Sequence, residues 1–362
     1  MRAMTELLTD CWGNPSSVHA HGIAAHHRLR QAREQVASAL GAEPDRVFFT
    51  SGGTEADNWA IFSAAERLGK RGHHIVTTAV EHHAVLHPMQ KLEAKGFEVT
   101  YLQPDHDGTI TVEELKKALR PDTILVSVMM VNNETGAVMP IADMVKAVRR
   151  ASPLALFHTD AVQAAGHLAI DVQRNNIDML SLSAHKFHGP KGIGLLFAKS
   201  SIQLTSLIRG GGQERGKRAG TENLPGIIGL AAALKDAQEN MQQNTAYITG
   251  LRDALRNGLD KIDGAGFNGS REHCLPGTVN YSFQGVNGEA LLSLLSNEGI
   301  CCSSGSACSA GSLEPSHVLL ALGLSHETAQ SALRFSLCEY NTMDEVQTII
   351  TKVTEAVNRL RR

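Results

Sequence analysis

The chain has 362 residues, of which 42% are hydrophobic and 20% charged, a composition that is typical of globular proteins and excludes disordered and fibrous classes. Its 34 Lys and Arg residues nearly balance 37 Asp and Glu residues, so a net charge of -3 gives no general attraction to nucleic acid or anionic lipid. No apolar run approaches the ~20 residues of a membrane span, and six cysteines without a CxxC pair predict free thiols in a reducing cytoplasm.

The chain up to Leu224 alternates short apolar runs with amphipathic helical patterns. A first helix is predicted at His26–Leu40, where Gly41 follows as a stop signal. Seven runs predict strands at Val47–Thr50, Ile75–Ala79, Glu98–Leu102, Ile124–Met130, Leu154–Thr159, Met179–Ser183 and Ile193–Ala198. Helices are predicted between them at Glu55–Leu68, Ala84–Lys95, Thr111–Leu119 and Ile141–Arg150. The alternation predicts an α/β fold, with a mostly parallel sheet wrapped by helices.

The pattern changes after Leu224. A long helical stretch, Pro225–Leu259, precedes a predicted strand at Thr278–Phe283. Further helices are predicted at Glu289–Glu298, Ser316–Ala321 and Met343–Leu360. We therefore expect a large domain over residues 14–240 and a smaller α+β domain over residues 241–362, which also includes residues 1–13 and carries Cys308.

A glycine pair lies between the first predicted strand and the next helix, in the sequence TSGGTE from Thr50 to Glu55. Glycine lets the backbone approach a ligand closely, and a helix start offers free N–H groups to an anion. The turn is therefore a candidate phosphate site. The alternative is an ordinary strand–helix turn capped by Thr54.

A lysine follows the predicted strand at Met179–Ser183, in the sequence SAHKFHGPKG. Ligands of open α/β sheets bind beyond the carboxyl ends of strands, which is where Lys186 falls. A lysine in this place can form a Schiff base with a carbonyl cofactor. The alternative is a solvated loop lysine, an interpretation that suits Lys191 better.

Two more strand ends carry polar side chains. Asp160, in HTDAVQ, could pair with a protonated ring nitrogen, or it could simply cap the following helix. His82, in VEHHAVL, could stack on a flat ring and move protons.

The segment CCSSGSACSAGS, which contains Cys308, consists of small residues apart from its cysteines and predicts an exposed loop. An accessible thiol can act as a nucleophile. Metal binding is the rival interpretation, but the only close spacing is Cys302 to Cys308 and no histidine lies within it, so no metal site is expected.

Taken in order and spacing, these motifs resemble the NifS-like cysteine desulfurases of the class V aminotransferase family. The resemblance runs from GNPSS at Gly13 to the C-terminus and includes VNNETG, GGGQERGKRAGTEN, SSGSACSAGSLEPSHVL and ALRFSL. The cysteine segment is similar to that of the long-loop subgroup. The resemblance implies a fold-type I transferase that uses pyridoxal 5'-phosphate to convert L-cysteine to L-alanine.

The resemblance also implies a role for each site residue. Lys186 would hold the cofactor aldehyde, Asp160 its pyridine nitrogen and Gln163 its ring hydroxyl, while His82 would stack on the ring and assist proton transfer. The phosphate would be held by Gly53, Thr54, Ser183 and His185, and by Thr221 of a second subunit in a homodimer. Asn133, also a cofactor contact, and Arg334 would bind the substrate carboxylate.

Cys308 would receive the sulfur as a persulfide and pass it to an acceptor thiol, such as that of an iron–sulfur scaffold, with which it could share a transient cluster. Cys301 and Cys302 are expected to be structural neighbours, and the alternative is that they also receive sulfur. Family members carry an upstream segment close to YLDNNATT, which is absent here, so a catalytically weak form is one alternative. Selenocysteine lyase and a catalytically idle sulfur-assembly scaffold are the others.

Overall fold

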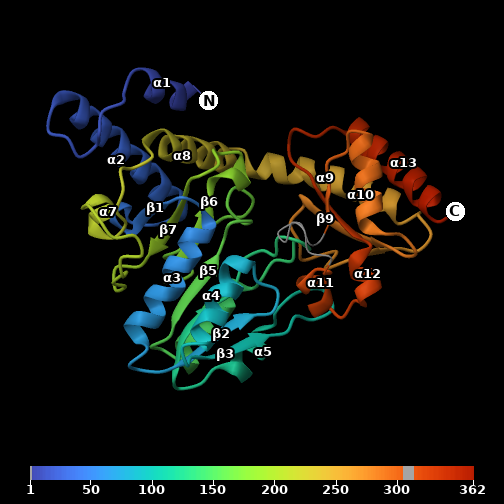
Figure 1. The fold of residues 1–362 in the computed structure, drawn as a ribbon, viewed down its shortest axis with the longest axis horizontal. Helices are drawn as coiled ribbons and strands as arrows, with labels where there is room; N and C mark the ends of the chain where they lie inside the picture. Colours follow the sequence, from blue (N-terminus) through green and yellow to red (C-terminus); the bar gives the residue numbers. More distant parts are fainter. Residues whose placement is uncertain (1, 305–313) are drawn as a thin grey trace.

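A seven-stranded sheet lies at the centre of the first part of the structure, a computed structural model that describes residues 2–304 and 314–362 (Figure 1). Its strands are β1 (Val47–Thr50), β2 (His74–Thr78), β3 (Glu98–Leu102), β4 (Thr123–Ser127), β5 (Leu156–Asp160), β6 (Met179–Ser183) and β7 (Gly194–Ala198), in the order β1-β7-β6-β5-β4-β2-β3. β7 is antiparallel to both of its neighbours, and the other pairs are parallel. The predicted mostly parallel sheet is confirmed.

The direction of the strands places several loops at one edge of this sheet. β2, β4, β5 and β6 run in the same direction, and the two antiparallel pairings through β7 turn β1 the same way. The carboxyl ends of these strands therefore share an edge, where polar residues distant in sequence can meet.

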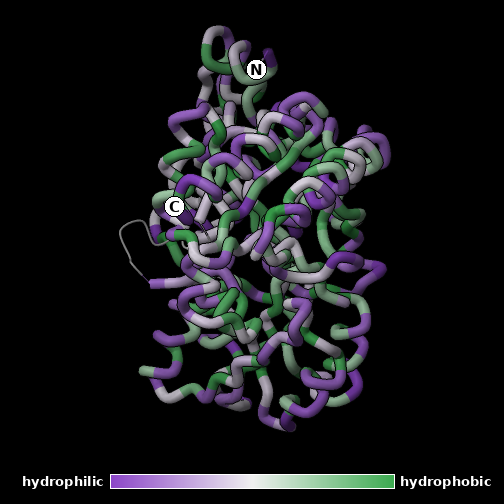
Figure 2. The backbone as a smooth tube through the Cα atoms, turned by 90° about the vertical axis from the view of Figure 1, so that its right-hand side faces the viewer, coloured by the Kyte–Doolittle hydropathy of each residue, from purple (hydrophilic) through white to green (hydrophobic). Residues whose placement is uncertain are grey.

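Each face of the sheet packs against its own hydrophobic core, because successive strand residues point to opposite faces. On β2, Ile75 belongs to one core and Val76 to the other, and Leu125 and Val126 divide in the same way on β4. Helices α3 (Gly53–Leu68) and α4 (His83–Glu93) cover the first face. The second is covered by α1 (Arg2–Thr9), α2 (Ala20–Leu40), α5 (Val112–Ala118), α6 (Ile141–Ala151) and α8 (Leu224–Glu239). Loops at the outside are largely hydrophilic (Figure 2).

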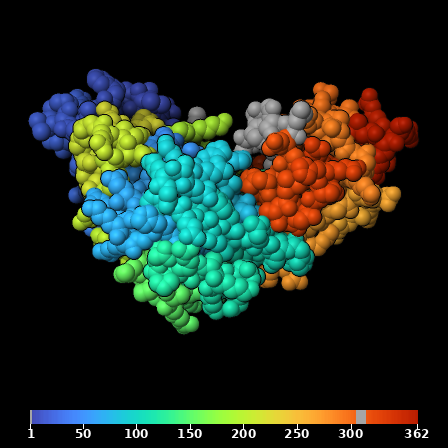
Figure 3. Space-filling model, turned by 60° about the horizontal axis from the view of Figure 1, so that its bottom comes forward, coloured from blue at the N-terminus to red at the C-terminus, as the bar shows by residue number. Residues whose placement is uncertain are grey.

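A smaller antiparallel sheet, in the order β10-β11-β9-β8, follows in the C-terminal part. Its strands are β8 (Ala265–Phe267), β9 (Thr278–Phe283), β10 (Ser303–Ser304) and β11 (Ala332–Ser336). Its helices are α9 (Met241–Leu259), α10 (Gly288–Asn297), α11 (His317–Ala321), α12 (His326–Gln330) and α13 (Met343–Leu360). Tyr281 and Phe283 anchor a separate core beneath α9, α10 and α13. Figure 3 shows this part, orange to red, as a lobe beside the blue and cyan surface.

The structure departs from the predicted elements in identifiable places. The stretch predicted as one helix breaks at Asn240, whose side-chain N–H donates to Asp236 O at 2.9 Å and so competes with the helical backbone. The strand predicted to reach Met130 ends at Ser127. α1, β8, β11 and α12 were not predicted. The division at residue 240 stays a prediction, although α1 packs against α8, which favours placing residues 2–9 with the large sheet.

Two short elements complete the part of the chain near the site. A 3-10 turn, η2 (Ala184–Phe187), follows β6, and α7 (Gln213–Gly216) lies in the glycine-rich segment before α8. Among the described residues, no helix is both long enough and apolar enough to cross a membrane.

Candidate active site

A cavity of about 330 Å³ lies at the edge where the strands of the large sheet end. Ten of the predicted site residues line it: Gly53, Thr54, His82, Asn133, Asp160, Gln163, Ser183, His185, Lys186 and Arg334. Thr221 is exposed and does not line it. Cys308 lies outside the described residues. The fold therefore brings together side chains from five loops and both sheets.

Asp160 ends β5 with its carboxyl group buried at the cavity wall. One oxygen, Oδ1, accepts a hydrogen bond from the Val162 N–H at 2.9 Å, but a turn and not the expected helix follows Asp160, so this is a turn interaction and not a helix cap. Burial raises the pKa of Asp160 to about 6, and the neighbouring Lys186 ammonium opposes that rise. A carboxylate here can neutralise a protonated ring nitrogen.

Two further buried carboxyl groups, Asp57 and Glu81, lie near Asp160 and were missed from the sequence. Burial raises the pKa of Glu81 to about 8. Burial, and then the charge of Asp160, raise the pKa of Asp57 well above its usual value. Neither Asp57 Oδ1 nor Glu81 Oε2 has a hydrogen-bond partner within the described ranges. One signal was available for Asp57, because in TSGGTEADN it lies four residues after Gly53 and so on the same face of α3.

The turn after β1 forms a cradle for an anion. Gly53 and Thr54 line the cavity at the start of α3, a helix of 16 residues whose first N–H groups have no partner within the helix. A Cβ on Gly53 would lie 2.7 Å from Val162 Cγ2, so glycine is needed for this close approach. With Ser183 and His185 on the opposite loop, the donors suit a phosphate group.

Glu55 holds this turn in place. It accepts a hydrogen bond from the Ser51 N–H at 2.8 Å and a two-point interaction from the Arg218 guanidinium at 2.9 and 3.1 Å. Arg218 belongs to the segment that carries Thr221, so that segment is fastened to the anion cradle.

His82 caps α4 and faces the cavity. Its Nδ1 accepts a hydrogen bond from the Ala84 N–H at 3.1 Å, which assigns the proton of the neutral ring to Nε2. Burial, followed by the charges of His83 and Lys186, lowers the pKa of His82 to about 4. The imidazole is therefore neutral at pH 7, next to the Lys186 ammonium.

Arg334 reaches the cavity from β11 of the small sheet. Its Nη1 donates to the Asn133 carbonyl oxygen at 2.6 Å. Neither Arg334 Nε nor Asn133 Oδ1 has a hydrogen-bond partner in the described part of the chain, although both are buried. Buried polar groups are nearly always paired, so these two side chains are suited to a polar ligand such as a carboxylate.

Both ends of the segment that contains Cys308 are fastened next to these two side chains. Ser303 of β10 lies opposite Arg334 in the sheet register. On the other side, the Ser316 hydroxyl donates to Glu134 Oε2, and Glu134 directly follows Asn133. Burial raises the pKa of Glu134 to about 7.

Comparisons with known proteins agree with this arrangement. The family described as Aminotransferase class-V matches residues 1–349. A curated protein named cysteine desulfurase IscS from Clostridium botulinum (strain Hall) is 47% identical over 364 residues, which span 100% of this chain and 91% of that protein.

Two solved structures are similar over nearly the whole chain. One, described as a NifS-like protein, superposes with a TM-score of 0.94 at 40% identity, covering 99% of this chain and 95% of the other. A second, described as SspA in complex with cysteine, has a TM-score of 0.79 at 38% identity and covers 94% and 95%.

Proposed function

The chain belongs to the class V aminotransferase family, and from that premise we propose that it is a pyridoxal 5'-phosphate-dependent cysteine desulfurase. It converts L-cysteine to L-alanine and leaves the sulfur on Cys308. The observation that carries this function is the meeting of Lys186, Asp160, His82 and Arg334 in one cavity. The selenocysteine lyase alternative is not favoured, because a relative of nearly equal length is named a cysteine desulfurase. The catalytically weak form and the idle scaffold are not favoured either.

The cavity fits the cofactor. Lys186 would hold its aldehyde, the buried Asp160 its protonated ring nitrogen, and Gln163 its ring hydroxyl. Its phosphate would lie at the start of α3, where the close packing of Gly53 on Val162 leaves no room for a side chain. When bound, pyridoxal phosphate supplies an electron sink for the removal of a proton from the substrate Cα.

Arg334 and Asn133 bind the substrate carboxylate. The guanidinium is held by the Asn133 carbonyl oxygen, which leaves Arg334 Nε to donate to a ligand. A planar guanidinium recognises a carboxylate through two parallel hydrogen bonds, so it fixes the orientation of the amino acid as well as its position.

His82 and Lys186 are the residues that transfer protons. The neutral His82 ring holds a proton on Nε2, the nitrogen that does not accept from Ala84. The Lys186 amine takes the Cα proton in this environment, and burial keeps His82 uncharged across the physiological pH range.

Cys308 then receives the sulfur. The thiol of Cys308 and L-cysteine give a Cys308 persulfide and L-alanine, so that one sulfur atom changes partner and no outside oxidant is needed. Cys308 itself lies outside the described residues, four positions after Ser304 of β10. Thiol exchange passes the sulfur on to an acceptor, for which we propose an iron–sulfur scaffold protein.

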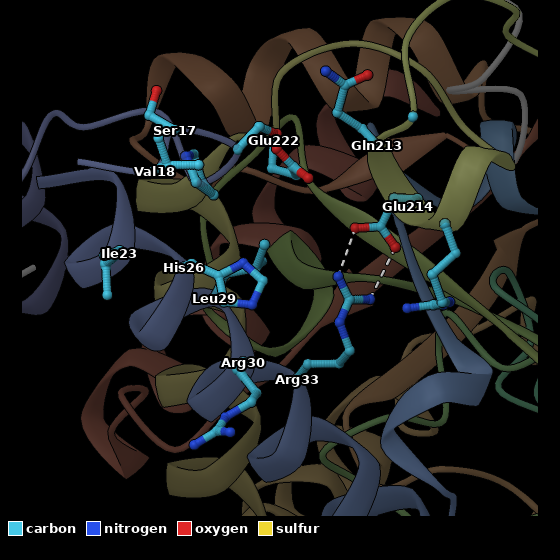
Figure 4. Close-up of a pocket in the computed structure, with 14 residues that line it drawn as sticks. Ser17, Val18, Ile23, His26, Leu29, Arg30, Arg33, Gln213, Glu214 and Glu222 are labelled. Atoms are coloured by element: carbon cyan, nitrogen blue, oxygen red, sulfur yellow. Dashed lines mark hydrogen bonds and ion pairs between the residues drawn. The ribbon is translucent and has the colours of Figure 1, made fainter. Parts of the chain in front are cut away.

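A second copy of the chain completes the assembly that we propose. A second cavity, of about 670 Å³, lies among residues of the N-terminal segment and of α7, and Val18 and Ile23 are exposed at it. Figure 4 shows the side chains that line this cavity, including the paired Arg33 and Glu214. Thr221 is exposed near the same surface and outside its own catalytic cavity. A homodimer would bury this surface and direct Thr221 to the phosphate of the other subunit.

The function is tested by a matched pair of cysteine variants. Wild-type protein supplied with pyridoxal phosphate should be yellow and should release alanine and sulfide from L-cysteine in the presence of a reducing thiol. Cys308→Ala should stay yellow and lose sulfide release, while Cys301→Ser should keep it. Lys186→Ala should lose the adduct that borohydride reduction otherwise fixes on the lysine. Undiminished sulfide release by Cys308→Ala would remove the persulfide from the mechanism.

A further inference from the structure

A histidine, a cysteine and a glutamate come together outside the catalytic cavity. His188 follows η2 at the end of β6, and Cys338 and Glu339 follow β11. One ligand atom of each side chain, an imidazole nitrogen, a thiol sulfur or a carboxylate oxygen, lies within 4.8 Å of the other two. The function proposed above gives these three side chains no role.

The spacing between two of the ligand atoms is that of neighbours around a metal ion. His188 Nε2 lies 3.4 Å from Glu339 Oε1, which is longer than a good hydrogen bond. A tetrahedral zinc ion with bonds of about 2.0–2.2 Å to nitrogen and oxygen holds those two atoms about 3.3–3.6 Å apart. The Cys338 sulfur completes the group and lies within 4.8 Å of both of these atoms.

The surrounding backbone holds the three side chains in place. His188 has a left-handed conformation with φ 62°, and its ring packs on Tyr340 with 5.2 Å between ring centroids. The Cys338 N–H donates to Asn341 Oδ1 at 2.9 Å, and the Asn341 N–H donates to the Cys338 carbonyl at 3.1 Å. This closed turn keeps Cys338 and Glu339 on the side that faces His188.

A fourth residue, His167, links the cluster to the catalytic turn. Its half-buried ring hydrogen-bonds the backbone of Lys186 and lies close enough to Glu339 and His188 to interact with both charges. The cluster is therefore adjacent to the turn that positions the cofactor lysine.

We propose that His188, Cys338 and Glu339 bind a zinc ion, with water in the fourth position. Nitrogen, sulfur and oxygen donors in a tetrahedral arrangement suit zinc, and three protein ligands leave one position open. Cys338 binds as the thiolate, so its proton is released to solvent and nothing is oxidised or reduced. The spacing of neighbouring cysteines does not indicate this site, because its ligands come from segments that are distant in sequence.

The ion would join the two halves of the structure. His188 belongs to the connection between β6 and β7 of the large sheet. Cys338 and Glu339 closely follow β11 of the small sheet, the strand that carries Arg334. Zinc would therefore hold the lysine side of the catalytic cavity to the arginine side.

The test uses Co²⁺ as the probe, added to the cofactor-loaded full chain after metal removal by a chelator. We expect one Co²⁺ per chain, with the long-wavelength absorption bands of a tetrahedral, thiolate-bound ion. Cys338→Ser should abolish the bands and weaken Co²⁺ binding at least about 100-fold. Losing a residue that only hydrogen-bonds a metal ligand typically costs about 10–100-fold in metal affinity, and Cys338 is itself a ligand. Cys274→Ser, which removes another half-buried free thiol, should leave the bands unchanged.

Two results would overturn the proposal. The first is the same bands in Cys338→Ser, and the second is their loss in Cys308→Ala, because either places the ion on another thiol. Glu339→Gln is the second test if Cys338→Ser does not fold, because Glu339 is partly exposed and its substitution should be tolerated. Zn²⁺ should raise the thermal unfolding midpoint of the wild type and not that of Glu339→Gln, whereas equal increases would contradict the site.

Discussion

Burial changes the pKa values of single ionisable residues in this site. Asp57, Glu81 and Asp160 are all buried, and each has a raised pKa because burial disfavours its ionised form. His82 is shifted the opposite way by the same cause, since for an imidazole the charged form is the protonated one. A cationic ring beside Asp160 would offset the repulsion that these carboxyl groups exert on one another.

Cofactor affinity should therefore depend on pH through Asp160. With a pKa of about 6 before the cofactor binds, Asp160 is ionised above that pH and becomes protonated below it, when it no longer attracts the ring nitrogen. Titration of the apoprotein with pyridoxal phosphate, followed by absorbance, should show affinity falling as the pH drops through about 6. Asp160→Asn should bind weakly and show no such step, whereas Asp143→Asn, on the exposed face of α6, should behave as the wild type.

The apoprotein should also lose stability as the pH rises, through Glu81. Its pKa is raised from 4.5 to about 8, so its contribution is fully present below 4.5 and is lost as the pH rises through about 8. The slope is at most about 1.4 kcal/mol per pH unit from this group. Urea unfolding followed from about pH 6 to about pH 9, which includes the upper part of the interval between the two pKa values, should give a flatter profile for Glu81→Gln. A profile as steep as that of the wild type would contradict this assignment.

At the scale of elements, the positions of strands and of the polar residues at their ends could be predicted from the sequence. The pairing of short strands with one another could not. Met179–Ser183 and Thr278–Phe283 were predicted with the bounds that the structure has, because an apolar run bounded by polar residues is visible in the sequence. β11 was missed as a strand although its residues were recognised as a motif, because its ladder depends on β9 and β10, which lie far away in sequence. The burial of Glu81 could not be predicted for the same reason.

The anchor at the start of α11 should control sulfur transfer. Ser316 caps α11 and also donates to Glu134, so Ser316→Ala removes a cap worth about 1 kcal/mol and one anchor of the cysteine segment. We expect slower persulfide formation on Cys308 in single-turnover assays, with the cofactor spectrum unchanged. Ser325→Ala removes the equivalent cap of α12, which has no such contact, and should leave the rate unchanged. Equal rates in the two variants would show that the anchor has no effect.

At the scale of the whole molecule, the catalytic cavity belongs to both sheets. Most of its lining comes from the strand ends of the large sheet, and Arg334 comes from the small one. The family resemblance predicted that Arg334 lies in the same site as Lys186. The alternation and spacing of residues alone did not predict it, because the sequence ALRFSL does not indicate which strands pair with it.

The proposed homodimer gives a test at this scale. Val18 is 92% exposed at the rim of the larger cavity, so an aspartate there would place a charge within the buried contact. Val18→Asp should shift the sedimenting species from dimer to monomer. Leu154→Asp, at a residue that is 67% exposed elsewhere on the surface, should remain dimeric. A wild-type protein that sediments as a monomer would contradict the assembly itself.

The two attachments of residues 305–313 have a consequence for how such proteins can diversify. One attachment is a backbone pairing opposite Arg334, and the other is a serine hydroxyl on Glu134, so both lie outside the stretch that they delimit. Changes in the length of that stretch therefore leave both attachments, beside Arg334 and Asn133, in place.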